Sequence, residues 1–246
     1  MLINMGLKFP AQYPVFGTKN KRKSLSYQQR SPYYWWWAYL RKNENYIVCC
    51  NNDGKGELAE LYTDFGDVRG DEFRLWWNER GASLFADFST TTVTQLKDKS
   101  EWDEQWADKN VLVFAVPLTP SKRDIQRAFA RLIKKVHTGK RGRTKDKWDF
   151  GNAAYKINRN FTISSLSTAL TVYEAYIANQ LLPNSERLKV WEIGVKLRLV
   201  GTAMPSSKDL HADNLIKRNR MAATVMRYVK QAKRITDGTS LGIFPA

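Results

Sequence analysis

Residues 31–50 read SPYYWWWAYLRKNENYIVCC, an aromatic and apolar run with a helix start at one end and a helix stop just beyond the other. Ser31 can cap a helix, and Pro32 suits the first helical position because its missing N–H has no partner to lose there. The run predicts an almost unbroken helix over 33–50, ended by the Asn-Asn-Asp-Gly that follows it. Five consecutive aromatic residues, Tyr33–Trp37, cannot share one side of a helix. We therefore expect this helix to be buried on several sides or to contact another protein, with stacking on single-stranded bases as the alternative.

Helical periodicity recurs along the rest of the chain, whereas strand-like patterns are short. The clearest helix is predicted over 121–136, where apolar residues recur every three or four positions after Ser121 and Asp124, a pair that resembles a capping box. A short helix is predicted from Glu57 to Phe65, stopped at Gly66, and the next begins with a cap at Asp71 and is interrupted at Gly81. Three more are predicted at 162–182, 186–200 and 209–235, the last ended by Asp237-Gly238. Residues 88–99 and 111–116 favour strands, but one or two strands cannot form a sheet core. The predicted fold class is mainly α: a multi-helix domain with at most one short strand pair, plus a C-terminal three-helix unit that resembles a helix-turn-helix.

Breaks in these patterns divide the chain into four segments. Residues 1–30 lack sustained periodicity and are predicted to be a basic N-terminal arm that becomes ordered on a partner. Residues 31–137 form an aromatic-rich helical domain, and 138–149 form a basic, glycine-containing loop or linker. Residues 150–246 are predicted to be a C-terminal trihelical DNA-binding unit.

The charge of the chain is large and uneven. The formal net charge is +16 over 246 residues. Residues 1–52 carry 8 Lys/Arg against 1 acid, residues 53–108 carry 6 against 14, and residues 109–246 carry 26 against 9. A chain that repels itself this strongly usually has a polyanionic partner, so we expect nucleic acid. The acidic middle is expected to pack against a basic segment or to keep one side of the protein away from phosphates.

Cysteine usage and hydropathy indicate the compartment. Cys49 and Cys50 are the two cysteines of the chain. Adjacent cysteines rarely form a disulfide with each other, so both are expected to be reduced core thiols. No apolar run reaches membrane-spanning length, and residues 1–9 are too short for a signal peptide. These features predict a cytoplasmic protein that does not engage a membrane.

The first candidate site is the helix at 121–136 together with the loop at 138–147. Glycine lets the main chain of such a loop come close to a phosphate backbone. The predicted phosphate-binding residues are Lys122, Arg123, Arg127, Arg131, Lys134, Lys135, Lys140, Arg141, Arg143, Lys145 and Lys147. The alternative is a solvated helix surface followed by a mobile hairpin.

The second candidate site is the C-terminal unit. A short apolar helix, a break at 201–207 and a long cationic helix give the outline of helix-turn-helix recognition, although the break is longer than the usual three or four residues. Asparagine can read adenine edges and arginine can read guanine edges. The predicted base or groove contacts are Asn214, Lys217, Arg218, Asn219, Arg220, Arg227 and Lys230. The alternative is a three-helix bundle with a solvated cationic surface.

Catalysis finds little support in the sequence. The two histidines, His137 and His211, lie far apart in the chain. A metal-dependent nuclease needs two or three converging carboxylates. Asp64, Asp67 and Asp71 have helical spacing, but glycines interrupt the helix they would need, and further carboxylates follow at Glu72, Glu101, Asp103 and Glu104. No nucleotide-binding glycine loop or zinc-ligand cluster is present, so we expect no catalytic residue, metal or cofactor.

Four segments together resemble a group of bacterial proteins encoded on integrative mobile elements near tyrosine recombinases. They are Ser31–Trp37, Asp64–Val68, the Trp76-Trp77 pair and Lys122–Phe129, and the resemblance spans about residues 25–235. It implies an auxiliary factor in the integration or circularisation of the element. The chain lacks the Arg, His, Arg and Tyr order of the recombinase itself, so the resemblance implies a protein that assists without cutting.

The expected function is therefore that of a non-catalytic DNA-binding accessory protein in recombination, which binds or bends the ends of a mobile element. Its expected partners are double-stranded DNA and a tyrosine recombinase. Two alternatives remain, namely a metal-dependent nuclease and an RNA-binding or phage-defence module.

Overall fold

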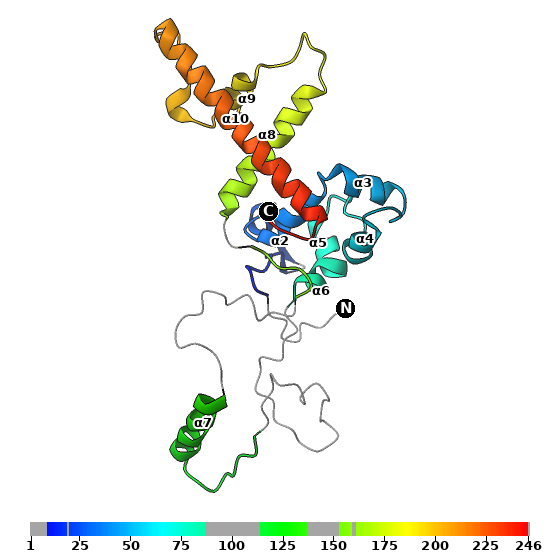
Figure 1. Ribbon diagram of the computed structural model, residues 1–246, viewed down its shortest axis with the longest axis vertical. Helices are drawn as coiled ribbons and strands as arrows, with labels where there is room; N and C mark the ends of the chain where they lie inside the picture. Colours follow the sequence, from blue (N-terminus) through cyan, green and yellow to red (C-terminus); the bar gives the residue numbers. More distant parts are fainter. Residues whose placement is uncertain (1–8, 19, 87–113, 137–152, 159–160, 246) are drawn as a thin grey trace. The chain divides into compact units, whose positions relative to one another are not determined.

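The computed structural model describes residues 9–18, 20–86, 114–136, 153–158 and 161–245 (Figure 1). The chain divides into two compact units, one made of Met1–Phe88 with Gly151–Ala246 and the other of Ser89–Phe150. This division differs from the expected one, because the C-terminal helices share a unit with the aromatic helical region. The reason is long-range packing, since α10 contacts α2 from the other end of the sequence.

The fold is mainly helical, as predicted. The first unit contains β1 (Gly17–Thr18), β2 (Lys21–Arg22), α1 (Leu25–Gln28), α2 (Pro32–Leu40), α3 (Glu44–Asn51), α4 (Ala59–Phe65), α5 (Phe73–Trp76), the π-helical turn η1 (Trp77–Gly81), α6 (Ala82–Phe85), α8 (Ile163–Gln180), α9 (Val190–Lys196), the 3₁₀ turn η4 (Gly201–Ala203) and α10 (His211–Ser240). Within the described residues the second unit contains α7 (Lys122–Val136). The one strand pair of the described chain is the antiparallel β1–β2, not the segments that sequence favoured. Residues 88–99 and 111–113 lie outside the described residues, and 114–116 have no regular secondary structure.

The aromatic run of α2 forms the centre of the core. Ser31 caps the helix by accepting a hydrogen bond from the Tyr33 N–H, and Pro32 occupies its first position, as predicted. Trp36 is fully buried between rings of Phe65, Phe85, Tyr155 and Phe244. The expectation that this helix is buried on several sides is confirmed, because four of its five consecutive aromatic residues are at most 5% exposed.

The predicted single helix over 33–50 is wrong, because the chain turns at residues 41–43 and starts again as α3. Asn43 causes the break. Its side-chain carbonyl caps α3 by accepting from the Tyr46 N–H at 3.0 Å, and its side-chain amide donates to the carbonyl of Thr236 at 2.9 Å. A buried asparagine side chain that is satisfied in this way ends one helix, begins the next and attaches both to α10.

Residues 9–30 are not a detached arm where they are described. Phe9, Ala11 and Phe16 pack against the core. The Ala11 N–H donates to the Tyr33 hydroxyl at 2.9 Å, and the Ser31 hydroxyl donates to the carbonyl of Gln12 at 2.7 Å. The expectation of an arm does not hold for these residues, because their apolar side chains lack periodicity along the chain and find partners in other elements: Phe9 contacts Tyr33 of α2 and Trp77 of η1, and Phe16 contacts Phe73 of α5.

The segment after α3 follows the sequence closely, with one exception. Gly66 ends α4 with a φ of +64°, a backbone conformation that favours glycine. Gly81 lies within the helical path of η1, and a Cβ there would lie 2.7 Å from the Trp77 ring, which explains why the position is glycine. The exception is Asp71, which was predicted to cap the next helix. Its carboxylate instead pairs with the guanidinium of Arg41 at 2.6 Å.

Helices α8, α9 and α10 form the C-terminal trihelical unit (Figure 1). Helix α9 is shorter than predicted, since residues 186–189 are held by Asn179, whose side chain hydrogen-bonds both the N–H and the carbonyl of Leu188. Helix α10 is longer than predicted and passes through Asp237-Gly238 to Ser240, because Gly238 is buried and helical there. The connection from α9 to α10 runs from Leu197 to Leu210 and includes η4, so the tight three- to four-residue turn of a helix-turn-helix is not formed.

Candidate nucleic-acid interface

Helix α10 has one packed side and one exposed cationic side. Its buried residues include Met221, Val225, Val229, Ala232 and Ile235, which recur every three or four positions and face α8, α9 and α2. At 100° per residue, the opposite side of the helix carries five exposed cations, which we call the basic stripe. The basic stripe consists of Arg220, Arg227, Lys230, Lys233 and Arg234.

The spacing of the basic stripe suits a regular polyanion. Arg220, Arg227 and Arg234 lie seven residues apart, which is about 10.5 Å, or nearly two turns, per step. From Arg220 to Lys233, none of the stripe cations has an ion pair with a carboxylate of the described residues. The guanidinium of Arg227 lies 5.3 Å from the ring of Tyr228, which holds it beside the helix. From Arg220 to Lys233, the stripe therefore presents positive charge with no described carboxylate paired to it along about 20 Å of helix.

Three of the predicted base contacts are diverted to other partners. The Asn214 side chain donates to the carbonyl of Ser206 at 2.9 Å and accepts from its N–H at 3.2 Å, so it holds the loop before α10. Lys217 pairs with Asp209 at 2.7 Å, and its hydrogen bond lowers the pKa of that carboxyl. The guanidinium of Arg218 lies 4.7 Å from the ring of Trp191 on α9.

The other predicted residues of α10 lie together on its outer surface. Asn219 and Arg220 are exposed, and so are Arg227 and Lys230. Asn219 forms no hydrogen bond through its side chain to another described residue, so its amide is free to contact a ligand. The stripe also includes Lys233 and Arg234, which the sequence reasoning left out of the contact set. Their spacing of three and four residues from Lys230, and the seven-residue step from Arg227 to Arg234, were the signals that could have included them.

Helix α7 is present as predicted and presents a second cationic surface. The Ser121 hydroxyl accepts from the Asp124 N–H and donates to the Asp124 carboxylate, as a capping pair does. Four predicted phosphate contacts share the side opposite the apolar residues, while Lys122 and Lys135 lie beside the apolar side. The four are Arg123, Arg127, Arg131 and Lys134, and all six cations are exposed. The remaining predicted contacts, Lys140, Arg141, Arg143, Lys145 and Lys147, lie outside the described residues.

The described aspartates considered for nuclease chemistry each have a separate partner. Asp64 accepts a hydrogen bond from the Tyr155 hydroxyl at 2.6 Å. Asp67 pairs with Arg69 at 2.7 Å, and Asp71 pairs with Arg41. Among the described residues, no group of three His, Cys, Asp or Glu side chains is arranged to hold a metal ion. Residues 101–104 and 137, which carry the other candidates, lie outside the described part.

Comparisons of the chain with family models, curated proteins and solved structures find no match. In the part of the chain that the structure describes, no helix combines the length and apolar character needed to cross a bilayer.

Proposed function

We propose that the protein binds double-stranded DNA without cutting it, through the basic stripe of α10, with α7 as a second phosphate contact. The observation that carries the proposal is the stripe itself. A 30-residue helix packs one side into the protein and leaves five cations on the other. A helix held in this way loses no further backbone freedom when it meets a polyanion.

The chemistry of the stripe favours backbone contact over base reading. Arginine and lysine contact phosphates of any sequence, whereas base edges are read mainly by positioned asparagine, glutamine and arginine side chains. Asn219 and Arg220 place an exposed amide next to an exposed guanidinium at the N-terminal end of the stripe. We therefore assign the stripe to phosphates and Asn219 with Arg220 to base edges.

The biological setting follows from the resemblance to proteins of integrative mobile elements. We assign the protein an accessory role in integration or circularisation, in which it binds or bends the ends of the element beside a tyrosine recombinase. We place it in the cytoplasm, where its two buried thiols would stay reduced.

The test is a titration of a labelled duplex followed by fluorescence anisotropy, from about 50 to 200 mM salt. If about six phosphates are neutralised, the affinity should fall roughly 10³-fold or more over that range. The double variant Arg227→Gln, Lys230→Gln should lower the salt slope by about 2. Lys55→Gln removes an exposed cation elsewhere and should leave the slope close to that of the unchanged protein.

Two results would overturn the proposal. A salt slope that is the same for the stripe variant and the control means that the stripe is only a solvated surface. Plasmid incubated with the protein and Mg²⁺ or Mn²⁺ should stay supercoiled, and nicking would replace the binding role with that of a nuclease. Competition with double-stranded RNA separates the third class of function, because preference for the RNA would exclude duplex DNA as the main ligand.

A further inference from the structure

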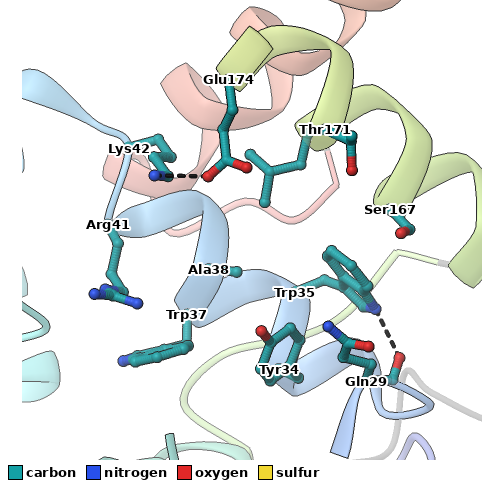
Figure 2. Close-up of a pocket in the computed structure, with 11 residues that line it drawn as sticks. Gln29, Tyr34, Trp35, Trp37, Ala38, Arg41, Lys42, Ser167, Thr171 and Glu174 are labelled. Carbon is teal, nitrogen blue, oxygen red and sulfur yellow. Dashed lines mark hydrogen bonds and ion pairs between the residues drawn. The ribbon is translucent and has the colours of Figure 1, made fainter. Parts of the chain in front are cut away.

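A small pocket lies between α2 and α8 (Figure 2), and none of its lining residues belongs to the basic stripe. Its volume is about 190 Å³. Aromatic side chains of α2 form one side, and hydroxyl groups of α8 face them (Figure 2). The lining includes Gln29, Tyr34, Trp35, Ser167, Thr171 and Glu174. Because ordinary small-molecule sites measure about 300–1,000 Å³, this pocket suits one planar heterocycle rather than a larger metabolite.

The polar side chains of the pocket have hydrogen-bonding capacity to spare. The indole N–H of Trp35 donates to the main-chain carbonyl of Gln29 at 2.7 Å, which leaves the side-chain amide of Gln29 free. The hydroxyls of Tyr34, Ser167 and Thr171 also form no hydrogen bond with another described residue. An amide and three hydroxyls can each donate and accept, so together they match the mixed donor and acceptor edge of a nucleobase.

The charged groups at the rim are already paired. Lys42 and Glu174 form an ion pair at 2.6 Å (Figure 2). Arg41 pairs with Asp71 and lies over the ring of Trp37 at 4.5 Å. The pocket itself is therefore close to neutral, which favours an uncharged ring over a free phosphate or a carboxylate.

The chain leading to the pocket is strongly basic. No carboxylate precedes Glu44 in the sequence. The hairpin β1–β2 exposes Lys21 and Arg22, and the next residue, Lys23, lies with its ammonium 4.8 Å from the Tyr27 ring centre. The guanidinium of Arg30 lies 4.5 Å from the centre of the same ring, so two cations contact one aromatic side chain. We call residues 21–30 the basic approach.

The basic approach and the pocket share one residue, Gln29. Arg30 follows Gln29 directly in the chain, and Gln29 lines the pocket. Two like charges gathered at one ring raise the local positive potential, and an anion beside them relieves their repulsion. Cations that follow a backbone, next to aromatic rings and a site for one base, are the arrangement by which proteins bind unpaired strands.

We propose that the pocket binds one unpaired base of single-stranded DNA whose phosphates lie along the basic approach. The proposal rests on the proposed function, because it assumes a DNA ligand, but it uses different residues. Duplex DNA would contact α10, and a single-stranded end or an opened junction would contact the α2–α8 pocket. A recombination factor with both surfaces would recognise a duplex next to an unpaired segment.

The experiment measures binding of a labelled single-stranded oligonucleotide and, in parallel, of the duplex used above. Thr171→Trp places a ring in the pocket from an exposed position of α8 and should weaken single-strand binding about tenfold, the effect of losing one stacked base. Ala178→Trp, two turns further along the exposed side of α8 and outside the pocket lining, should change neither affinity. Lys21→Gln with Arg22→Gln should weaken single-strand binding and lower its salt slope, without affecting the duplex. Circular dichroism of each variant checks that it folds.

The outcomes separate this proposal from the proposed function. If duplex binding depends on the stripe while single-strand binding is absent or ignores Thr171→Trp, the pocket proposal is overturned and the duplex role stands. If duplex binding is absent but the single strand binds and responds to Thr171→Trp, the pocket stands and the duplex role fails. Tighter binding of an RNA strand of the same sequence would overturn the assignment to DNA.

Discussion

Substitution of Trp36 tests whether the aromatic run is core or binding surface. Trp76, a second buried tryptophan outside the run, provides a matched comparison for the role of the indole hydrogen bond. Trp36 is fully buried, and its indole N–H has no hydrogen-bond partner among the described residues. Trp36→Ala removes contacts with four neighbouring rings and should lower the free energy of unfolding by about 3–5 kcal/mol. Since domains of ordinary stability unfold with about 5–15 kcal/mol, this loss is a large part of the total.

Replacement by phenylalanine separates packing from hydrogen bonding. The Trp76 indole N–H donates to the buried carbonyl of Phe65 at 2.7 Å, whereas that of Trp36 donates to no described residue. Both substitutions lose the same ring atoms, but Trp76→Phe also leaves the Phe65 carbonyl without that donor. We therefore expect Trp76→Phe to cost about 1–2 kcal/mol more than Trp36→Phe.

The assay is urea unfolding followed by far-ultraviolet circular dichroism, which does not depend on the tryptophans being changed. The free energies of unfolding are compared only between proteins whose m values, the slopes against urea concentration, agree. A change in slope is then not mistaken for a change in stability. If Trp36→Ala leaves stability unchanged and weakens only DNA binding, the assignment of this ring to the core is refuted. Equal costs for the two phenylalanine variants would refute the role given to the Trp76 hydrogen bond.

Three further substitutions test other parts of the structure. Asn179→Ala removes both hydrogen bonds to the main chain of Leu188 and should lower the free energy of unfolding by about 1–3 kcal/mol, and no change would show that the loop before α9 holds without them. Gly194→Val places a Cβ within 2.5–2.9 Å of side chains of α10 and should lower the free energy of unfolding by about 1–3 kcal/mol in the same assay. An unchanged stability would show that α9 is not held tightly against α10. The hydrogen bond from Arg69 lowers the pKa of Asp67, so the stabilisation is present above the ordinary carboxyl pKa and is lost as pH falls through the lowered value. Asp67→Asn should cost a few tenths of a kcal/mol at neutral pH, since the pair is exposed, and nothing in strong acid; an equal cost at both pH values would contradict the pairing.

Much of the secondary structure could be predicted because its causes are local. The start of α2 at Ser31 and Pro32, the end of α4 at Gly66 and the amphipathic α7 each depend on residues within about one turn of one another. The prediction failed where a distant partner overrides local preference. Asn43 ends α2 because its amide donates to Thr236, which lies 193 positions away in the chain.

The candidate site shows the same limit. Sequence identified α10 as a long cationic helix, and three of its five outward cations, Arg220, Arg227 and Lys230, were among the predicted contacts. The sequence did not separate Lys217 and Arg218 from Arg220, because all three are cations on the same turn of the helix and nothing local shows which of them has a partner. Their different roles depend on Asp209 and Trp191, which come from the preceding loop and from α9.

The charge of the chain, its helical class and the ends of several helices follow from composition and from the periodicity of neighbouring residues, which are properties of the unfolded chain as much as of the folded one. Which cations remain unpaired, which rings are buried and where a pocket forms were decided by tertiary packing. The physical reason is that a side chain's exposure and partners depend on what lies across from it. For the described residues of 9–30, for α2 and for the packed side of α10, that neighbour is far away in sequence.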